Sequence, residues 1–230
     1  MQLHLQTWPD VEAYLKDSHG IIIPIGSTEQ HGPTGLIGTD ALTAEMIGRG
    51  VGDKVGALVA PTISVGMAQH HLDFPGSMTV RPTTLIALIR DQVMSLARNG
   101  FTRFYFLNGH GGNIATVTAS FSEIYAERSM ERMSNQPPLK CVLRNWWESN
   151  GVTSLRREFY GGSEGSHLHD PQLHFVQDSG GVVAAAGRDD LIFENVAVHG
   201  DSAAGVARAW PCGRGLHDVR ANQNVVCVCR

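Results

Sequence analysis

Four short apolar runs, separated by segments with helical periodicity, constrain the fold of this chain more than any other feature. The runs cover residues 20–26, 57–61, 104–107 and 139–147. They lack the alternation of apolar and polar residues that a strand with one solvated face shows, so each fits a strand buried on both faces. Such strands occur in parallel sheets covered by helices, and the sequence therefore predicts an α/β fold with a mainly parallel sheet.

The segments between these runs include three expected helices, at residues 40–55, 82–99 and 114–133. The apolar stripe of the second helix consists of Leu85, Leu88, Ile89, Val93 and Leu96. The first helix contains glycines at positions 48, 50 and 52, which lower its helix propensity. Strands and helices alternate along the chain, as they do in βαβ units.

Composition limits the class of protein. The 230 residues are enough for a single domain spanning 1–230, and 42% hydrophobic residues with a net charge of −4 exclude intrinsic disorder. This charge provides no overall attraction to nucleic acid or anionic lipid. No apolar run reaches the ~20 residues that span a bilayer. The N-terminus lacks a signal-peptide pattern and the four cysteines are too few for a disulfide framework, so we expect a cytoplasmic protein.

Polar and glycine-rich segments follow the expected strands, at the edge of the sheet where α/β proteins bind ligands. The first is STEQHGPTGLIGTD, in which Glu29 and His31 are two residues apart and Asp40 lies nine residues beyond His31. Two carboxylates and an imidazole are ligands that Zn²⁺, Mn²⁺ and Fe²⁺ accept. The alternative is that Asp40 caps a helix beside an ordinary polar loop, and the spacing alone leaves both interpretations open.

The second segment is NGHGGN at residues 108–113, in the loop between an expected strand and the helix that follows it. His110 stands between glycines, which let the backbone approach a ligand closely. The alternative is an anion-binding turn in which His110 has no role, although the segment lacks the fingerprint of a phosphate or dinucleotide loop. Because both segments follow strands of the same sheet, we favour a metal site.

These motifs resemble those of the creatininase (creatinine amidohydrolase) family. GSTEQHGPTGLIGTD, HLDFPGS and FLNGHGGN carry the resemblance, which extends over about residues 20–167. It implies a three-layer α/β/α fold, a homo-oligomer such as a hexamer, and two divalent cations, Zn²⁺, Mn²⁺ or Fe²⁺, per subunit. By the same resemblance, Glu29, Asp40 and His110 are ligands of one cation, and His31 and Asp40 are ligands of the other, with Asp40 bridging.

The resemblance also implies the activity and its remaining residues. A metal-activated water would hydrolyse the C–N amide bond of a small-molecule substrate, with His167 as the general acid. Glu164 would either orient His167 or bind metal. His71 and Trp147 would line the substrate pocket.

Three positions depart from the family pattern. Gly112 replaces a glutamate ligand of creatininase, Gln172 replaces the later glutamate of other relatives, and Thr34 replaces a second histidine. Creatinine is therefore a less well supported substrate than amides in general. Two alternatives stay open: a metallopeptidase that clips a short peptide, and a catalytically impaired protein with a binding or assembly role.

The pattern stops abruptly after His167. Residues 168–230 contain scattered glycines, no long periodic helix and a VVCVCR ending. A shift of reading frame or an alternative end would produce such a break, and a divergent tail that wraps the site or an oligomer contact is the other interpretation.

Overall fold

The structure is a computed structural model, and it describes residues 1–130, 137–160, 174–175, 182–184, 196–198 and 227–229. Its main sheet consists of β1 (Gly20–Ile25), β2 (Leu58–Val59), β3 (Arg103–Asn108) and β4 (Lys140–Asn145). The strands lie in the order β2-β1-β3-β4, and every neighbouring pair is parallel. The predicted α/β fold with a parallel sheet is confirmed.

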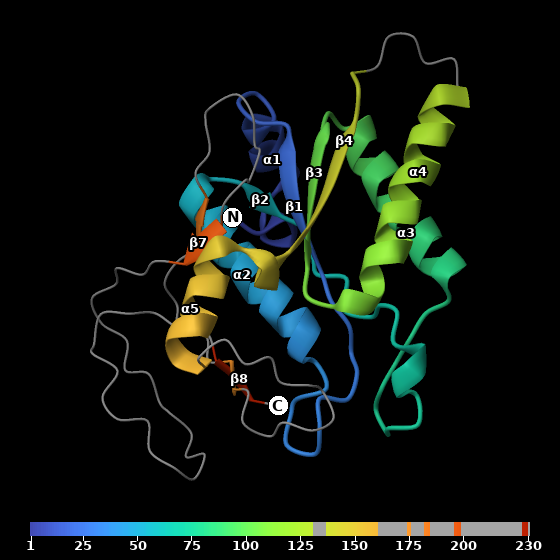
Figure 1. The fold of residues 1–230 in the computed structure, drawn as a ribbon. Helices are drawn as coiled ribbons and strands as arrows, with labels where there is room; N and C mark the ends of the chain where they lie inside the picture. The colour runs from blue at the N-terminus through green and yellow to red at the C-terminus, as the bar shows by residue number, and fades with distance from the viewer. Residues whose placement is uncertain (131–136, 161–173, 176–181, 185–195, 199–226, 230) are drawn as a thin grey trace.

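Helices cover both faces of this sheet. Helix α2 (Thr39–Val55) lies on one face, and α3 (Pro82–Arg98) and α4 (Ile114–Met130) lie on the other (Figure 1). Successive residues of β1 point to opposite faces: Ile21 and Ile23 pack in the cluster that includes α3 and α4, whereas Ile22 packs with Ile47 and Val51 of α2. Burial on both faces explains why the strand sequences show no polar alternation.

The order of the strands places a switch point between β1 and β3. From β1 the chain runs through α2 to β2 on one side, and it then returns through α3 to β3 on the other side of β1. The connections above the carboxyl ends of β1 and β3 therefore diverge, which opens the position where sheets of this kind bind ligands. The two motif segments follow these two strands.

Glycines bring α2 unusually close to the sheet. A Cβ on Gly48 would lie 3.0 Å from Pro24, and one on Gly52 would overlap Val59. At the amino end of the helix, a Cβ on Gly26 would overlap the backbone of Asp40 and Ala41, and one on Gly109 would overlap the carbonyl oxygen of Asp40. Gly48 and Gly52, two of the three glycines that lower helix propensity, thus serve packing, because a residue without a side chain fits closely between helix and strand.

The remaining elements are short or peripheral. They are α1 (Trp8–Tyr14), α5 (Asn150–Tyr160), and the 3₁₀ turns η1 (Leu3–Leu5), η2 (Gln69–His71), η3 (Gly111–Asn113) and η4 (Trp146–Glu148). After residue 160, β5 (His174–Phe175) pairs antiparallel with β8 (Cys227–Cys229), and β6 (Val182–Ala184) pairs likewise with β7 (Val196–Val198). Most of residues 168–230 lie outside the described residues, so the two interpretations of this stretch stay predictions.

Three details differ from the sequence-based expectations. Strand β2 contains only Leu58 and Val59, and β4 ends at Asn145, before the two tryptophans. Leu88 of the predicted stripe is 41% exposed, because only Leu85, Ile89 and Val93 of α3 are fully turned toward the sheet.

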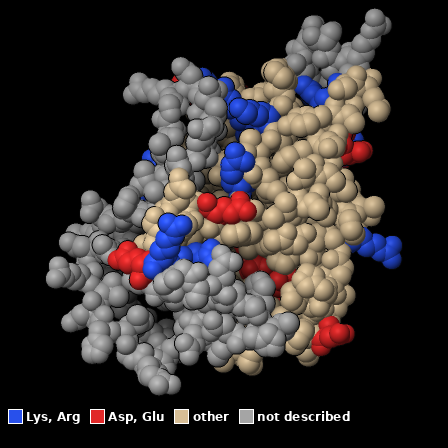
Figure 2. All heavy atoms as spheres, viewed as in Figure 1, with Lys and Arg blue, Asp and Glu red and all other residues tan. Residues whose placement is uncertain are grey.

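No helix among the described residues is long and apolar enough to cross a membrane. On the face shown in Figure 2, basic and acidic side chains are interspersed.

The close contact at the amino end of α2 leads to a prediction. Gly109→Ala places a methyl group against the carbonyl oxygen of Asp40, so we expect α2 to shift and the free energy of unfolding to fall by about 1–3 kcal/mol. Gly50→Ala, in the same helix, meets no atom within 4 Å and should stabilise the protein by up to ~1 kcal/mol. Urea denaturation of both variants checks this, and equal effects would contradict it.

Candidate metal centre

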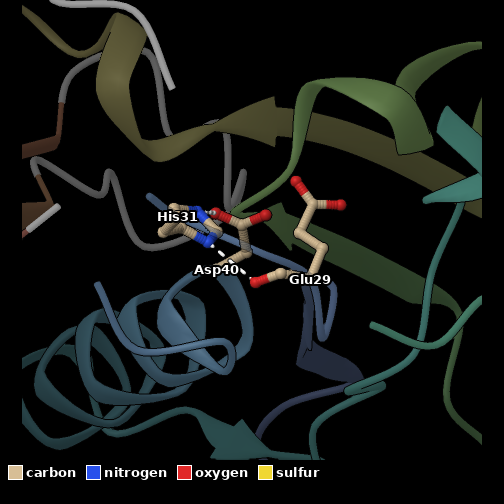
Figure 3. A group of neighbouring side chains, drawn as sticks. All are labelled: Glu29, His31 and Asp40. Carbon is tan, nitrogen blue, oxygen red and sulfur yellow. Dashed lines mark hydrogen bonds and ion pairs between the residues drawn. The ribbon is translucent and has the colours of Figure 1, made fainter. Parts of the chain in front are cut away.

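Three buried side chains meet at the carboxyl end of β1. Glu29 and His31 lie in the loop after this strand, and Asp40 lies in the first turn of α2. One ligand atom from each of the three lies within 4.8 Å of the others (Figure 3). The loop that joins β1 to α2 therefore brings together the residues that the sequence predicted as metal ligands.

The ring of His31 is held in one orientation by the backbone. Its Nδ1 lies 3.1 Å from the carbonyl oxygen of Glu29, and its Nε2 lies 2.9 Å from Oδ1 of Asp40. A carbonyl oxygen can only accept, so Nδ1 carries a proton and Nε2 faces the carboxylates. Metal-binding histidines have this arrangement, in which one nitrogen donates to a carbonyl and the other is directed to the ion.

His110 joins the same cluster from β3. Its Nε2–H donates to the carbonyl oxygen of Met67 at 2.9 Å. Its Nδ1 lies 2.9 Å from Oδ2 of Asp40 and 3.2 Å from Oε1 of Glu29. Asp40 thus directs one carboxylate oxygen to each imidazole, Oδ1 to His31 and Oδ2 to His110.

Glu29 is the least compensated member of the cluster. Its side chain is 0% exposed, and neither carboxylate oxygen accepts a hydrogen bond within the part of the chain that the structure describes. A buried carboxylate without donors is costly unless a cation neutralises it. Two carboxylates and two imidazoles are a donor set that suits Zn²⁺, Mn²⁺ or Fe²⁺, so the residues present fit a divalent metal.

The pKa values of the cluster reflect two opposing effects, the burial of the charged groups and the hydrogen bonds between them. Burial raises the pKa of Glu29 to about 7. Burial also acts to raise the pKa of Asp40, but the hydrogen bonds from His110 and His31 outweigh it and lower this pKa to about 2. For His31 and His110, burial lowers the pKa, but the hydrogen bond with Asp40 prevails and both pKa values are raised.

Two buried asparagines of the NGHGGN segment hold the surrounding loops together. Asn113 donates to the carbonyl oxygen of Gly26 at 2.9 Å and accepts from the backbone N–H of Met67 at 3.0 Å. Asn108 accepts from the N–H of His110 at 3.1 Å and donates to Oδ1 of Asn145 at 2.8 Å. These bonds connect the ends of β1, β3 and β4 and the segment after β2, and so help to fix the positions of the clustered side chains.

The other predicted site residues have different positions. His71 lies at the cluster, with its Nε2 3.4 Å from Oε1 of Glu29. Trp147 lies in η4 after β4 and packs edge-to-face on Trp146, with the ring centroids 6.0 Å apart. His167, Glu164 and Gln172 lie outside the described residues.

The space around Gly112 explains one departure from the family pattern. A Cβ at this position would lie 2.5 Å from Nε2 of His110 and 2.5 Å from the carbonyl oxygen of Met67. The hydrogen bond between these two groups occupies the room that a glutamate would need. The orientation of His110 and the absence of a glutamate at position 112 are therefore linked.

We expect the stability of the metal-free protein to fall as the pH rises. The folded-state pKa values of Glu29, His31 and His110 are all raised, so each group holds its proton more tightly in the folded protein than in the unfolded chain. This stabilisation is present at low pH, and it is lost for Glu29 between pH 4.5 and about 7, and for the histidines above 6.5. The expected loss from about pH 5 to 8 is on the order of 1–3 kcal/mol.

A bound cation replaces these protons, so the Zn²⁺-loaded protein should lose less stability over the same range. Urea denaturation with and without Zn²⁺ measures the difference. Glu29→Gln serves as the control, because it removes one of the titrating groups and should flatten the profile of the metal-free protein. Parallel profiles with and without Zn²⁺ would refute the assignment.

Comparison with known proteins agrees with this geometry. The family model for creatininase, described as creatinine amidohydrolase, matches residues 4–170. The mycofactocin precursor peptide peptidase of Mycobacterium ulcerans (strain Agy99) is 33% identical over 130 residues, which are 53% of this chain and 48% of that protein. The 3-dehydro-scyllo-inosose hydrolase of Thermotoga maritima (strain ATCC 43589 / DSM 3109 / JCM 10099 / NBRC 100826 / MSB8) is 28% identical over 171 residues, 73% of this chain and 50% of that protein.

Solved structures support the same fold. The structure "Creatininase Mn" superposes with a TM-score of 0.65 at 24% identity, over 72% of this chain and 66% of that chain. The chain spans about half the length of the curated relatives named above. The family match covers well over half of the 230 residues, and the chain therefore belongs to the creatininase family.

Proposed function

We propose that this protein is a metal-dependent hydrolase that cleaves an amide C–N bond. The observation that carries the proposal is the position of Asp40, whose two carboxylate oxygens face two different imidazoles, each with its remaining nitrogen hydrogen-bonded to a backbone carbonyl. One carboxylate between two oriented ligands suits a pair of cations that share it. The family membership agrees with a hydrolytic reaction.

The proposed ligands divide into two groups around Asp40. Glu29 and His110, whose Oε1 and Nδ1 lie 3.2 Å apart, would hold one cation together with Asp40. His31 would hold the other, again with Asp40. When bound, divalent cations of this kind lower the pKa of a coordinated water and polarise a carbonyl group. The protein's own part is to keep the four side chains fixed and shielded from solvent.

A hydrolase of this type needs a proton donor for the leaving nitrogen. We propose His167 for this role on the strength of the family resemblance, with Glu164 orienting it or completing the second cation site. An imidazole suits the task because its unperturbed pKa of about 6.5 lets it donate a proton near neutral pH. Trp147 and His71 are the proposed substrate contacts.

A short peptide is the second candidate substrate. Four large apolar side chains on the segments that follow β1 and β2 are exposed: Leu36 is 66% exposed, Leu72 53%, Phe74 43% and Met78 49%. The backbone N–H of Met78 donates to the carbonyl oxygen of Thr28, so Met78 lies beside the loop after β1. The backbone N–H of Phe74 donates to the carbonyl oxygen of His71, so Phe74 belongs to the turn whose His71 lies beside Glu29. Exposed apolar groups around a polar centre fit a substrate with apolar side chains better than a small polar ring such as creatinine.

The first test is a panel of amides. We expect the Mn²⁺- or Zn²⁺-loaded protein to hydrolyse at least one of creatinine, a small formamide and short peptides with apolar residues, with products identified by mass spectrometry. Removal of the metal should abolish the activity, and re-addition should restore it. Full activity in the metal-free protein would contradict the proposal. Metal binding without hydrolysis of any amide would favour the catalytically impaired alternative.

The second test concerns Asp40. Asp40→Asn keeps the size of the side chain but removes the charge that both imidazoles face, so metal affinity should fall more than the roughly 10–100-fold typical of an outer-shell change. Asp53→Asn, at the exposed carboxyl end of the same helix, removes the same charge 13 residues away and should bind metal like the unaltered protein. Mass spectrometry of both variants gives the metal content. Equal metal content would show that Asp40 is not a shared ligand.

A further inference from the structure

Gln30 lies between two proposed ligands in sequence, yet its side chain points to a third histidine. Its Nε2 lies 3.0 Å from Nδ1 of His71, and both side chains are buried. His71 belongs to η2, which lies 41 residues away along the chain. The contact therefore links the ligand loop after β1 to the segment after β2.

The backbone determines which way the Gln30 amide is turned. The N–H of Gly32 donates to Oε1 of Gln30 at 2.8 Å, and a backbone N–H can donate only to an oxygen of this amide. The other end of the amide is then the NH₂ group, which donates to Nδ1 of His71. Nδ1 accepts this bond, so the proton of the neutral ring is on Nε2.

Nε2 of His71 lies beside the carboxylate of Glu29, with 3.4 Å between Nε2 and Oε1 and no hydrogen bond between these two atoms. A neutral imidazole binds a metal through a nitrogen that has a free lone pair, and in this tautomer Nε2 has none. His31 and His110 differ from His71 in this respect. In each of these two rings one nitrogen donates to a backbone carbonyl, and the other nitrogen faces Asp40 and can bind a metal.

We propose that Gln30 is a positioning residue that keeps His71 in the Nε2–H tautomer, and that His71 is consequently a hydrogen-bond donor at the metal centre and not a metal ligand. Its donor lies beside Glu29, where it would meet a substrate oxygen bound at the cluster. The tautomer follows from the hydrogen bonds alone, whereas the contact with substrate rests on the proposed function. The proposal assigns different roles to three histidines that lie close together.

Nuclear magnetic resonance of ¹⁵N-labelled protein tests the tautomer directly, because protonated and unprotonated ring nitrogens differ in chemical shift and coupling. In the metal-free protein we expect His71 to show a protonated Nε2 and an unprotonated Nδ1. After Zn²⁺ loading, Nε2 of His71 should keep its proton, whereas the nitrogens of His31 and His110 that face Asp40 should take metal-bound shifts. A protonated Nδ1, or loss of the Nε2 proton on Zn²⁺ binding, would overturn the proposal.

Gln30→Glu tests the role of the amide with little change in shape. A carboxylate can still accept from Gly32, but it cannot donate to His71, so Nδ1 of His71 should become protonated. Gln69→Glu is the matched control, since it adds the same charge at an exposed position in the turn that carries His71. Its His71 spectrum should be unchanged. An unprotonated Nδ1 in Gln30→Glu would show that Gln30 does not control the tautomer.

His71→Ala separates donation from ligation. We expect the variant to keep the metal content of the unaltered protein and to lose on the order of 10²-fold in kcat on the substrate identified by the panel, as for the loss of one donor to a developing oxyanion. Reduced metal content with unchanged folding, seen by circular dichroism, would make His71 a ligand. If no substrate is found, the spectra and the metal content still decide the tautomer, so failure of the proposed function remains distinguishable.

Discussion

The burial of two carboxylates at one point, between the ends of β1 and β3, is the constraint on which the rest of the site depends. Asp40 is compensated by two imidazoles and by its place in the first turn of α2, where the helix dipole favours negative charge. Glu29 has no comparable donors among the described residues, and its raised pKa of about 7 reflects that cost. The surrounding loops must therefore hold two carboxylates together although their negative charges repel each other. The hydrogen bonds of Asn108 and Asn113 between these loops supply the necessary rigidity.

Much of the fold could be predicted from the sequence because buried parallel strands leave a simple pattern. The runs at residues 20–26 and 104–107 became β1 and β3, and burial on both faces explains their uniform apolar character. The sequence analysis does not predict helix α1, although its start can be read from the sequence. Thr7 and Asp10 form a capping box, and Pro9 lies in the first turn. The length of β2 could not be predicted, because it depends on pairing with β1.

The candidate site divides in the same way. The motifs and the family resemblance predicted Glu29, His31, Asp40 and His110 as metal ligands, and the structure brings these four side chains together. The roles of Gln30 and Asn113 could not be predicted, since each depends on partners 41 to 87 residues away in the sequence. Asparagine and glutamine carry no charge and appear in most loops, so composition gives no reason to single them out. The role of each amide depends on the group that its oxygen and its NH₂ contact in the folded protein.

The glycine contacts of α2 have a consequence for how this protein tolerates change. Near Asp40 the helix rests on backbone atoms at Gly26 and Gly109, and along its length it rests on the strands through Gly48 and Gly52. At the amino end of α2, beside Asp40, the distance between helix and sheet is thus set by main-chain contact, whereas Gly48 and Gly52 meet the side chains of Pro24 and Val59. Substitutions such as Ile47→Val or Val51→Ala would then cost stability while the ligand geometry persists. Mutations in the apolar layer under α2 can therefore change the stability of the protein without changing the geometry of the site.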